Sequence, residues 1–382
     1  MVVERGKRRD FKNMYLKKLK LTNFKNCSSA EIDFSAKINC FIGDNGAGKT
    51  NILDAIYYLS FCKSYFNSID NQNIKHEEDF FAIHGEYFNE DETNDLISCV
   101  QKRAKKKSFK KNKKEYDRLA DHIGLLPLVM ISPYDRDLIN DGSELRRKYI
   151  DGVISQFDNI YLKSLLAYNK TLLQRNTLLK QFAERHYFDK ASLQVWDDKL
   201  CELGIIIHEK RRDFLKEFNP LFESYYQYLS QGSENVEIVY DSQLLEKPMQ
   251  ELLEENIEKD RIVKYTTQGI HKDDLILNIK GFPVKKYGSQ GQQKSFVIAI
   301  KLAQFEYTRL KKEFKPILLF DDIFDKLDDK RVQQIIHLVN ENNFGQVFIT
   351  DTQKQRIEHL FREADIDHLI FSVNSGNVEK EV

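Results

Sequence analysis

The pattern of apolar and polar positions changes twice along the chain. Residues 16–24 and 30–34 mix apolar and polar positions as half-buried strands do, and the unbroken apolar run 38–42 predicts a buried strand. From residue 143 to about 229, apolar residues recur at helical spacing, so we expect a helical insertion of roughly 90 residues. The pattern predicts further strands at 80–87, 96–100, 317–320 and 346–350, and helices at 292–313 and 329–340.

These elements predict an α/β fold divided into two lobes. Residues 14–123 and 311–382 are assigned to lobe I, which carries a mixed sheet, and residues 124–310 to a largely helical lobe II. Residues 1–13 are strongly polar without a clear period. We expect this segment to be a disordered tail or an extension from an upstream start codon.

Length and composition indicate a globular protein. The chain has 382 residues, 41% hydrophobic and 31% charged, which is enough for one large domain or two to three ordinary ones. No apolar run approaches the roughly 18 to 20 residues that span a bilayer, and the N-terminus has no apolar export segment. We therefore expect a cytoplasmic location and no membrane. The five cysteines lie far apart without a C-x-x-C pair, which predicts reduced thiols.

The charges cancel, so nucleic acid would have to bind at a local patch. The chain has 59 basic and 59 acidic residues, and its densest basic stretch is 102–114. On composition alone, this stretch is slightly better explained as a solvated hairpin than as a DNA contact. The candidates for a DNA contact are Lys105, Lys106, Lys107, Lys110 and Lys111.

The segment 43–50 reads GDNGAGKT between a predicted strand and a predicted helix, the pattern of a phosphate-binding loop. Glycines let backbone N–H groups turn towards phosphate oxygens, Lys49 can reach the β- and γ-phosphates, and Thr50 can hold Mg²⁺. We therefore predict that the cofactors are ATP and Mg²⁺. The predicted nucleotide-binding residues are Gly43, Asp44, Asn45, Gly46, Ala47, Gly48, Lys49, Thr50 and Asn51.

A second motif follows about 270 residues later, where the apolar run 317–320 ends in two carboxylates. This is the Walker B pattern. Asp321 is predicted to hold Mg²⁺ together with Thr50, and Asp322 to act as the general base for the attacking water. Lys49 and Asp322 are the predicted catalytic residues.

A third motif, the turn 287–295, is predicted to open a helix and offers a second anion site. Alone it could be an ordinary helix cap with Ser289 as the capping residue. Its place about 30 residues before the Walker B strand is that of the signature turn of ABC-type ATPases. In that class the turn of one subunit closes over the γ-phosphate bound by the other. The signature residues are Ser289, Gln290, Gly291 and Gln292.

Together these motifs resemble the RecF family of bacterial recombination mediator ATPases, which are related to SMC proteins. The resemblance rests on the loop 43–51, the turn 288–294 and the segment 320–328, and it runs from Met14 almost to the C-terminus. It also includes the stretches 131–151 and 269–275. The signature turn with its two glutamines is the most specific of these features.

The resemblance implies an ABC-type P-loop ATPase head that dimerises on ATP. Asp328 would lie in the D-loop that crosses the dimer. RecF-like proteins bind duplex DNA next to single-stranded gaps and help load the recombinase through RecO and RecR, which makes the 102–114 stretch a better DNA candidate. Asp322 stands where most ABC ATPases have Glu, so we expect slow hydrolysis that acts as a release timer. Thr350-Asp351 replaces the switch His of transporters, and His271 and Asp273 are further candidate functional positions.

Two other functions fit parts of the sequence. A transporter ATPase subunit would share the three motifs, but about 240 residues separate Lys49 from Gly288, which is more than such subunits usually have. A P-loop kinase would leave the signature turn without a role. We therefore expect an ATP-controlled DNA-binding protein of recombinational repair and replication restart.

Overall fold

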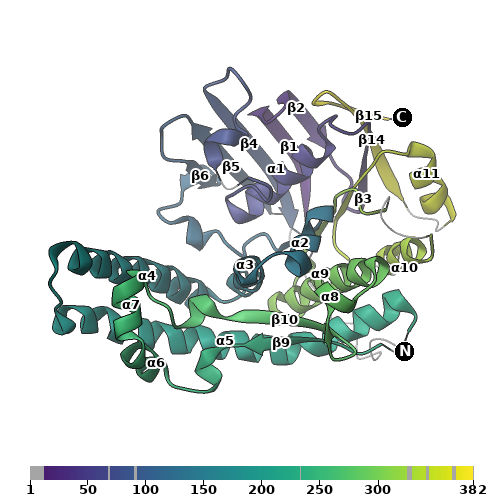
Figure 1. Cartoon of the computed structure of the whole chain (residues 1–382). Helices are drawn as coiled ribbons and strands as arrows, with labels where there is room; N and C mark the ends of the chain where they lie inside the picture. The colour runs from purple at the N-terminus through teal and green to yellow at the C-terminus, as the bar shows by residue number, and fades with distance from the viewer. Residues whose placement is uncertain are drawn as a thin grey trace. The chain divides into compact units, whose positions relative to one another are not determined.

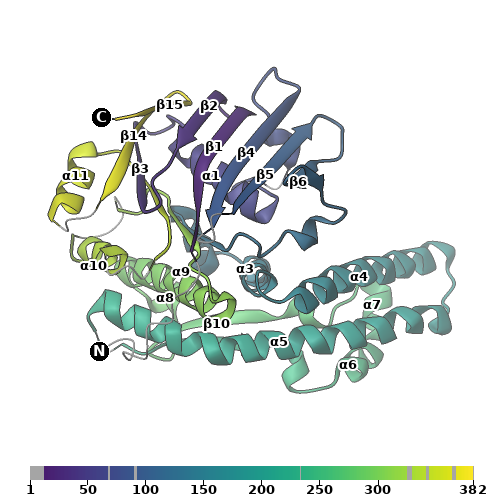
Figure 2. The same cartoon turned by 180° about the vertical axis from the view of Figure 1, so that it is seen from behind.

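A computed structural model describes residues 13–67, 69–89, 93–232, 234–324, 329–340, 344–363 and 367–381. The chain forms two compact units (Figures 1 and 2). Unit 1 contains the described residues up to Asp135, then Tyr225–Gly232 and the part from Lys294 onward. Unit 2 contains Arg136–Ser224 and the described part of 233–293. No helix among the described residues is long and apolar enough to span a membrane.

Unit 1 is built on two six-stranded sheets. The first is antiparallel, with strand order β2-β1-β4-β5-β6-β7. Its strands are β1 (Met14–Phe24), β2 (Cys27–Asp33), β4 (Phe80–Asn89), β5 (Asn94–Lys102), β6 (Ser108–Lys111) and β7 (Lys114–Glu115).

The second sheet has the order β15-β14-β3-β13-β12-β8, and all its neighbours pair in parallel except the edge strand β15. Strands β3, β8, β12 and β13 are buried at every position, as parallel strands covered on both faces must be. The strands are β3 (Ile38–Ile42), β8 (Leu128–Ile131), β12 (Ile317–Phe320), β13 (Val347–Asp351), β14 (His368–Asn374) and β15 (Asn377–Lys380).

One hydrophobic core joins both sheets of unit 1. Helix α1 (Lys49–Phe61) contributes to this core and contacts strands of each sheet. The fully buried Gln346 links the sheets through polar groups, because its amide pairs with the backbone N–H and C=O of Leu16, both at 2.8 Å. It also donates to the carbonyl of Ser35 at 2.7 Å. Unit 1 further contains α10 (Asp329–Asn340) and α11 (Lys354–Glu363).

Unit 2 combines helices with a small antiparallel sheet of order β11-β10-β9. Helix α3 contacts both α4 and β10, and α4 contacts α7. The sheet strands are β9 (Val236–Asp241), β10 (Asp274–Ile279) and β11 (Phe282–Pro283). The helices are α2 (Asp137–Asn140), α3 (Ser143–Ser155), α4 (Asn159–Arg185), α6 (Met249–Glu255), α7 (Ile257–Val263), α8 (Val284–Tyr287) and most of α5 (Lys190–Ser230).

The boundaries of the units differ from those predicted for the lobes. Strand β8 pairs with β12 and so belongs to unit 1, although lobe II was expected to begin at residue 124. Helix α9 (Gln290–Lys312) enters unit 1 at Lys294 rather than at 311, because its residues 295–308 are all buried. The stretch 269–291, for which no strand was predicted, contains β10 and β11.

Candidate nucleotide-binding site

The phosphate loop connects the end of β3 to the start of α1 in unit 1. A pocket on this loop is lined by Asn45, Gly46, Gly48, Lys49, Thr50, Asn51 and Asp322. Gly48 has φ of 112°, in the left-handed region that side chains disfavour, and α1 starts at the next residue. The first N–H groups of α1 lack helical partners, so they are available to an anion in this pocket.

Lys49 lies inside the loop. Its side chain is buried and its Nζ donates hydrogen bonds to the carbonyls of Gly43 at 2.6 Å and Asp44 at 3.0 Å. The ammonium group is therefore held at the inner edge of the loop.

Thr50 and Asp321 come together as the sequence predicts, although 271 residues separate them. The Thr50 hydroxyl donates to Asp321 Oδ1 at 2.8 Å, and Thr350 donates to the same oxygen at 3.0 Å. Burial raises the pKa of the Asp321 carboxyl, while these hydrogen bonds oppose the shift. A hydroxyl beside a carboxylate is a hard-oxygen pair suited to Mg²⁺.

Asp322 lines the pocket with a strained backbone. Its φ of 49° is unusual for a residue other than glycine, and its N–H donates to the Thr350 hydroxyl at 2.9 Å. Its Oδ1 is buried and finds no hydrogen-bond partner among the described residues. Thr350 is itself fully buried and fixes both acidic residues.

Asn26 supports the loop, a role that the motifs did not indicate. It lies in the turn between β1 and β2, where its Nδ2 donates to the Ala47 carbonyl at 3.2 Å. Its Oδ1 accepts from Asn51 Nδ2 at 2.7 Å. The only sequence signal for this role is an Asn in a predicted turn, which is common in proteins of every function.

The signature turn forms a capping box at the start of α9. Ser289 N–H donates to Gln292 Oε1 at 2.7 Å, and Gln292 N–H donates back to Ser289 Oγ at 3.2 Å. Gln292 also donates from its Nε2 to Glu234 in unit 2. Ser289 and Gln290 are exposed and Gly291 is partly exposed. The predicted D-loop residue Asp328 lies outside the described residues.

The lysine-rich stretch does not present all its lysines to solvent. Lys107 is turned inward, with a side chain only 9% exposed, and its Nζ is 2.7 Å from Asp70 and 2.6 Å from the carbonyl of Cys62. We correct its assignment as a DNA candidate, because this ion pair holds the charge away from solvent. Lys111 is paired with Asp95 at 2.9 Å. Lys105 and Lys106 are exposed and Lys110 is partly exposed.

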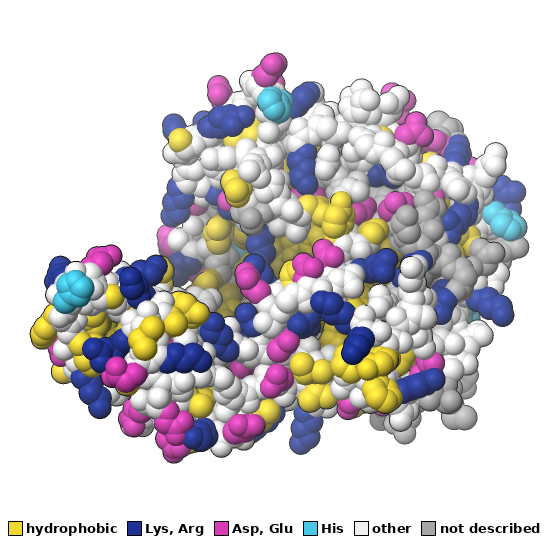
Figure 3. Space-filling view, in the orientation of Figure 1, with side chains coloured by type: hydrophobic (Ala, Val, Ile, Leu, Met, Phe, Trp, Pro, Cys, Tyr) yellow, Lys and Arg dark blue, Asp and Glu magenta, His cyan; other side chains and the backbone are white. Residues whose placement is uncertain are grey.

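One face of the molecule agrees with the balanced charge of the chain. On the face drawn in Figure 3, basic and acidic side chains alternate over most of the surface. No block of one charge covers this face. On this face, lysines therefore form local groups rather than a broad basic surface.

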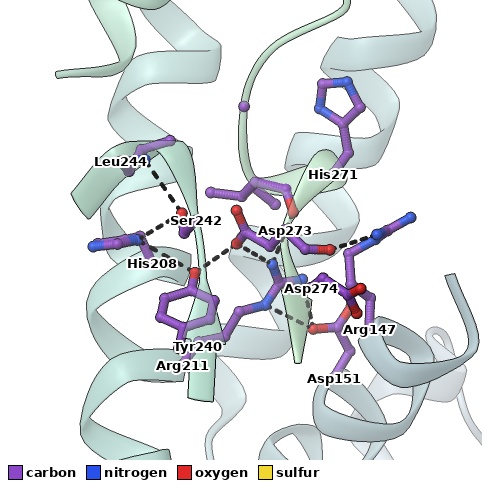
Figure 4. A network of polar contacts seen from close by, with 12 residues as sticks. Arg147, Asp151, His208, Arg211, Tyr240, Ser242, Leu244, His271, Asp273 and Asp274 are labelled. Carbon is purple, nitrogen blue, oxygen red and sulfur yellow. Dashed lines mark hydrogen bonds and ion pairs between the residues drawn. The ribbon is translucent and has the colours of Figure 1, made fainter. Parts of the chain in front are cut away.

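Asp273 belongs to a buried polar network in unit 2 (Figure 4). The ring of His271 makes separate contacts, with the hydroxyl of Tyr168 and the carbonyl of Thr266, both at 3.0 Å. Arg211 donates to Asp273 Oδ2 and to Asp151, both at 2.8 Å, and Arg147 donates to the carbonyl of Asp273. Burial lowers the pKa of His271 to about 4, so the ring is neutral at neutral pH. These contacts give His271 and Asp273 a structural role.

The arginines of helix α3 serve the same network. Arg146 makes two hydrogen bonds to the carboxylate of Asp274, at 2.7 and 2.9 Å. Lys148 pairs with Glu144 one turn away on the same helix. From the sequence, Arg146, Arg147 and Lys148 were a second, weaker candidate for DNA binding. The ion pairs of Arg146 and Lys148 with acidic residues favour the alternative, in which this basic group pairs with acidic neighbours.

The fold and the pocket define a P-loop ATPase head of the ABC and SMC type, which confirms the predicted fold class. The chain belongs to the RecF/RecN/SMC N terminal domain family, whose sequence model matches residues 15–373. Within this family it resembles the DNA replication and repair protein RecF of Flavobacterium johnsoniae, with 53% identity over 94% of this chain and 100% of the relative. RecF of Bacteroides thetaiotaomicron is 48% identical over 96% of this chain and 99% of its own length.

Solved structures agree with this assignment. The structure of the recombination mediator protein RecF with ATP, described as part of the RecFOR pathway, is 29% identical, covers 99% of this chain and 100% of its own and has a TM-score of 0.89. The Smc head domain of Pyrococcus furiosus covers 96% of both chains at a TM-score of 0.57 and 19% identity, which shows the shared fold. The resemblance inferred from the motifs is confirmed, and the transporter alternative is wrong.

Proposed function

We propose that this chain is an ATP-dependent DNA-binding protein of replication and recombinational repair. The observation that carries the proposal is the meeting of Lys49, Thr50, Asp321 and Asp322 around one phosphate loop. The name of its relatives, DNA replication and repair protein, and the solved RecF complex with ATP support the assignment of the ligand and of the process.

The residues of the pocket have separate tasks in this proposal. Loop N–H groups and Lys49 bind the phosphates, while Thr50 and Asp321 would hold Mg²⁺. The metal supplies positive charge that offsets the phosphate charges. Asp322 orients the attacking water and accepts its proton, a task that suits its unpartnered oxygen in the pocket.

Hydrolysis is proposed to be weak and to time release. Asp322 has a side chain one methylene shorter than the Glu of most ABC ATPases, so its carboxylate reaches less far from the strand end. The strained backbone of Asp322 fixes the direction in which its carboxylate points. DNA is proposed to stimulate the reaction by favouring the assembled dimer.

The signature residues Ser289, Gln290, Gly291 and Gln292 are proposed to contact the γ-phosphate bound by a second copy of the chain. The exposed start of α9, a helix of 23 residues, presents a positive dipole end to solvent. Gln292 would then act through the cap of Ser289 rather than by direct contact. Asp328 keeps its proposed D-loop role by resemblance alone.

Exposed lysines of unit 1 are proposed to bind duplex DNA next to a single-stranded gap. The proposed set contains Lys105 and Lys106, which are exposed, and Lys110, which is partly exposed. Lys111 is a weaker candidate because it is paired with Asp95. Phosphate contacts of this kind give affinity without reading sequence. RecO and RecR are the proposed partners for recombinase loading, in a cytoplasmic, nucleoid-associated setting.

Steady-state ATP hydrolysis with and without gapped duplex DNA tests the proposal. We expect DNA to stimulate hydrolysis, and the stimulation to fade between low and moderate salt. Asp322→Asn is the blank, since it keeps the shape of the side chain and removes its basicity. Hydrolysis that is indifferent to DNA at every salt concentration would contradict the proposal.

A further inference from the structure

Two turns from opposite ends of the chain hold the same backbone oxygen of the phosphate loop. In the turn between β14 and β15, the N–H of Gly376 donates to the Ala47 carbonyl at 2.8 Å. In the turn between β1 and β2, Asn26 Nδ2 donates to that oxygen at 3.2 Å. The C-terminal hairpin also lies against the loop's first residue, because a Cβ placed on Gly43 would be 2.2 Å from the Val373 carbonyl oxygen.

The shared oxygen matters because of the geometry of the next peptide group. In a trans peptide the C=O of Ala47 and the N–H of Gly48 point in opposite directions. Ala47 is buried, whereas Gly48 lines the pocket. Holding the carbonyl on the buried side therefore holds the Gly48 N–H towards the phosphate side.

Without these anchors the same peptide could rotate. Glycine at position 48 has no Cβ to oppose rotation, and its φ of 112° lies in a region that only glycine occupies readily. A rotated peptide would direct the lone pairs of Ala47 at a bound phosphate. The freedom that lets the loop wrap a phosphate also allows a conformation that repels one.

We propose that Gly376 and Asn26 are positioning residues that keep the phosphate loop in its anion-binding conformation before the nucleotide arrives. The inference rests on the proposed binding of nucleotide at this loop, and it makes the C-terminal hairpin part of the nucleotide site. Neither residue needs to touch the ligand. Their contribution is preorganisation, which lowers the cost of binding.

Gly376→Ala tests the hairpin anchor. Gly376 has φ of 86°, and an added Cβ would lie 2.6 Å from the backbone oxygen of Asn26 and 3.1 Å from the Cα of Cys27. These neighbours are backbone atoms that cannot swing aside. The hairpin must therefore move away from the loop, and the bond to Ala47 is lost.

Gly281→Ala is the matched control. Gly281 follows Lys280 in the turn between β10 and β11, with φ values of 77° and 52°, close to the 86° and 48° of Gly376 and Ser375. An added Cβ there meets nothing within 4 Å. Both substitutions impose the same local strain, but only one bears on the phosphate loop.

The measurement is a fluorescence titration with mant-ADP and Mg²⁺, because ADP binding involves neither hydrolysis nor the γ-phosphate. We expect the Kd of Gly376→Ala to rise about fivefold, which corresponds to one hydrogen bond of about 1 kcal/mol. Asn26→Ala, which leaves the hairpin intact, should give a similar rise. Gly281→Ala should stay within about twofold of wild type. In ATP hydrolysis, the KM of Gly376→Ala and of Asn26→Ala should rise, while the kcat at saturating ATP stays unchanged.

The outcomes separate this inference from the proposed function. If the wild-type protein does not bind mant-ADP, the nucleotide-binding proposal itself fails. If the wild type binds and both Gly376→Ala and Asn26→Ala bind equally well, the positioning role is overturned. An equal loss of mant-ADP affinity in Gly281→Ala would also overturn the positioning role, since the effect would then come from local strain and not from contact with the phosphate loop.

Discussion

Replacing Lys301 by methionine will measure how far unit 1 depends on one buried ion pair. Lys301 Nζ, on α9, lies 2.7 Å from Asp135 Oδ1, and the two side chains are 6% and 3% exposed. The hydroxyl of Tyr65 donates to the same carboxylate, and Tyr65 N–H is held at 2.7 Å by Asp54 on α1. The pair therefore connects the helix that follows the phosphate loop with the helix that starts at the signature turn.

The expected cost follows from the contacts that remain. Breaking a buried pair by removing one partner costs about 3–5 kcal/mol, because an unpaired charge stays inside. In Lys301→Met, Asp135 keeps its hydrogen bonds from Tyr65 and from the N–H of Ser132, the latter at 2.7 Å. We therefore expect a loss of stability at the lower end of this range, about 3 kcal/mol. This corresponds to about a 100-fold rise in the equilibrium constant for opening.

Hydrogen exchange read by mass spectrometry will test this value. Peptides from the buried part of α9 and from β12 should exchange about 100-fold faster in Lys301→Met. Peptides from β10 in unit 2 serve as the internal reference. Lys20→Met is the control, because Lys20 pairs with Glu31 at 3.1 Å on the exposed face of β1.

A double variant distinguishes the unpaired charge from a simple loss of packing. Lys301→Met with Asp135→Leu removes both charges of the pair, so the double variant should be less destabilised than Lys301→Met alone. Unchanged exchange in the single variant, or a double variant whose cost is the sum of the two single costs, would refute the reasoning.

Three further perturbations test other contacts. Lys105→Gln with Lys106→Gln should weaken binding of gapped duplex by roughly tenfold at moderate salt and reduce the slope of log K against log salt by about 2, as measured by anisotropy at several salt concentrations. Gln346→Leu should destabilise unit 1 by about 3 kcal/mol in urea unfolding, because the N–H and C=O of Leu16 lose their partners. His271 has its pKa lowered to about 4, below the ordinary 6.5, so the unfolded chain takes up a proton first and unit 2 should lose stability as the pH falls from 6.5 towards 4. His271→Gln should flatten that dependence, read by the fluorescence of the single tryptophan in α5.

The residues that meet at the pocket could be predicted, because each of them follows a predicted strand. Lys49 and Thr50 follow β3, and Asp321 and Asp322 follow β12, with β13 between the two strands. All three strands are parallel, so their carboxyl ends meet at one edge of the sheet. The order of short apolar runs, each followed by polar residues, was therefore sufficient to predict that these residues lie close together.

The direction of side chains outside such motifs could not be predicted. Lys106 and Lys107 cannot be distinguished by sequence, since both lie in the same basic stretch. In the structure, Lys107 pairs with Asp70 and contacts the end of α1, while Lys106 is exposed. Composition carries no information about a partner 37 residues away. The same holds for Arg146, whose partner Asp274 lies on a strand that the periodicity did not reveal.

The loop anchors show a more general limit on what a sequence reveals. Lys49 and Asp322 are proposed to act on the ligand through their side chains, so their residue types can be recognised as parts of a motif. Gly376 acts through a backbone N–H, which every residue except proline has, and what distinguishes it is the absence of a Cβ next to Asn26. A glycine at a hairpin turn is explained by turn geometry alone, as Gly281 demonstrates. The support of a flexible site therefore becomes apparent only when the fold shows which turn lies against it.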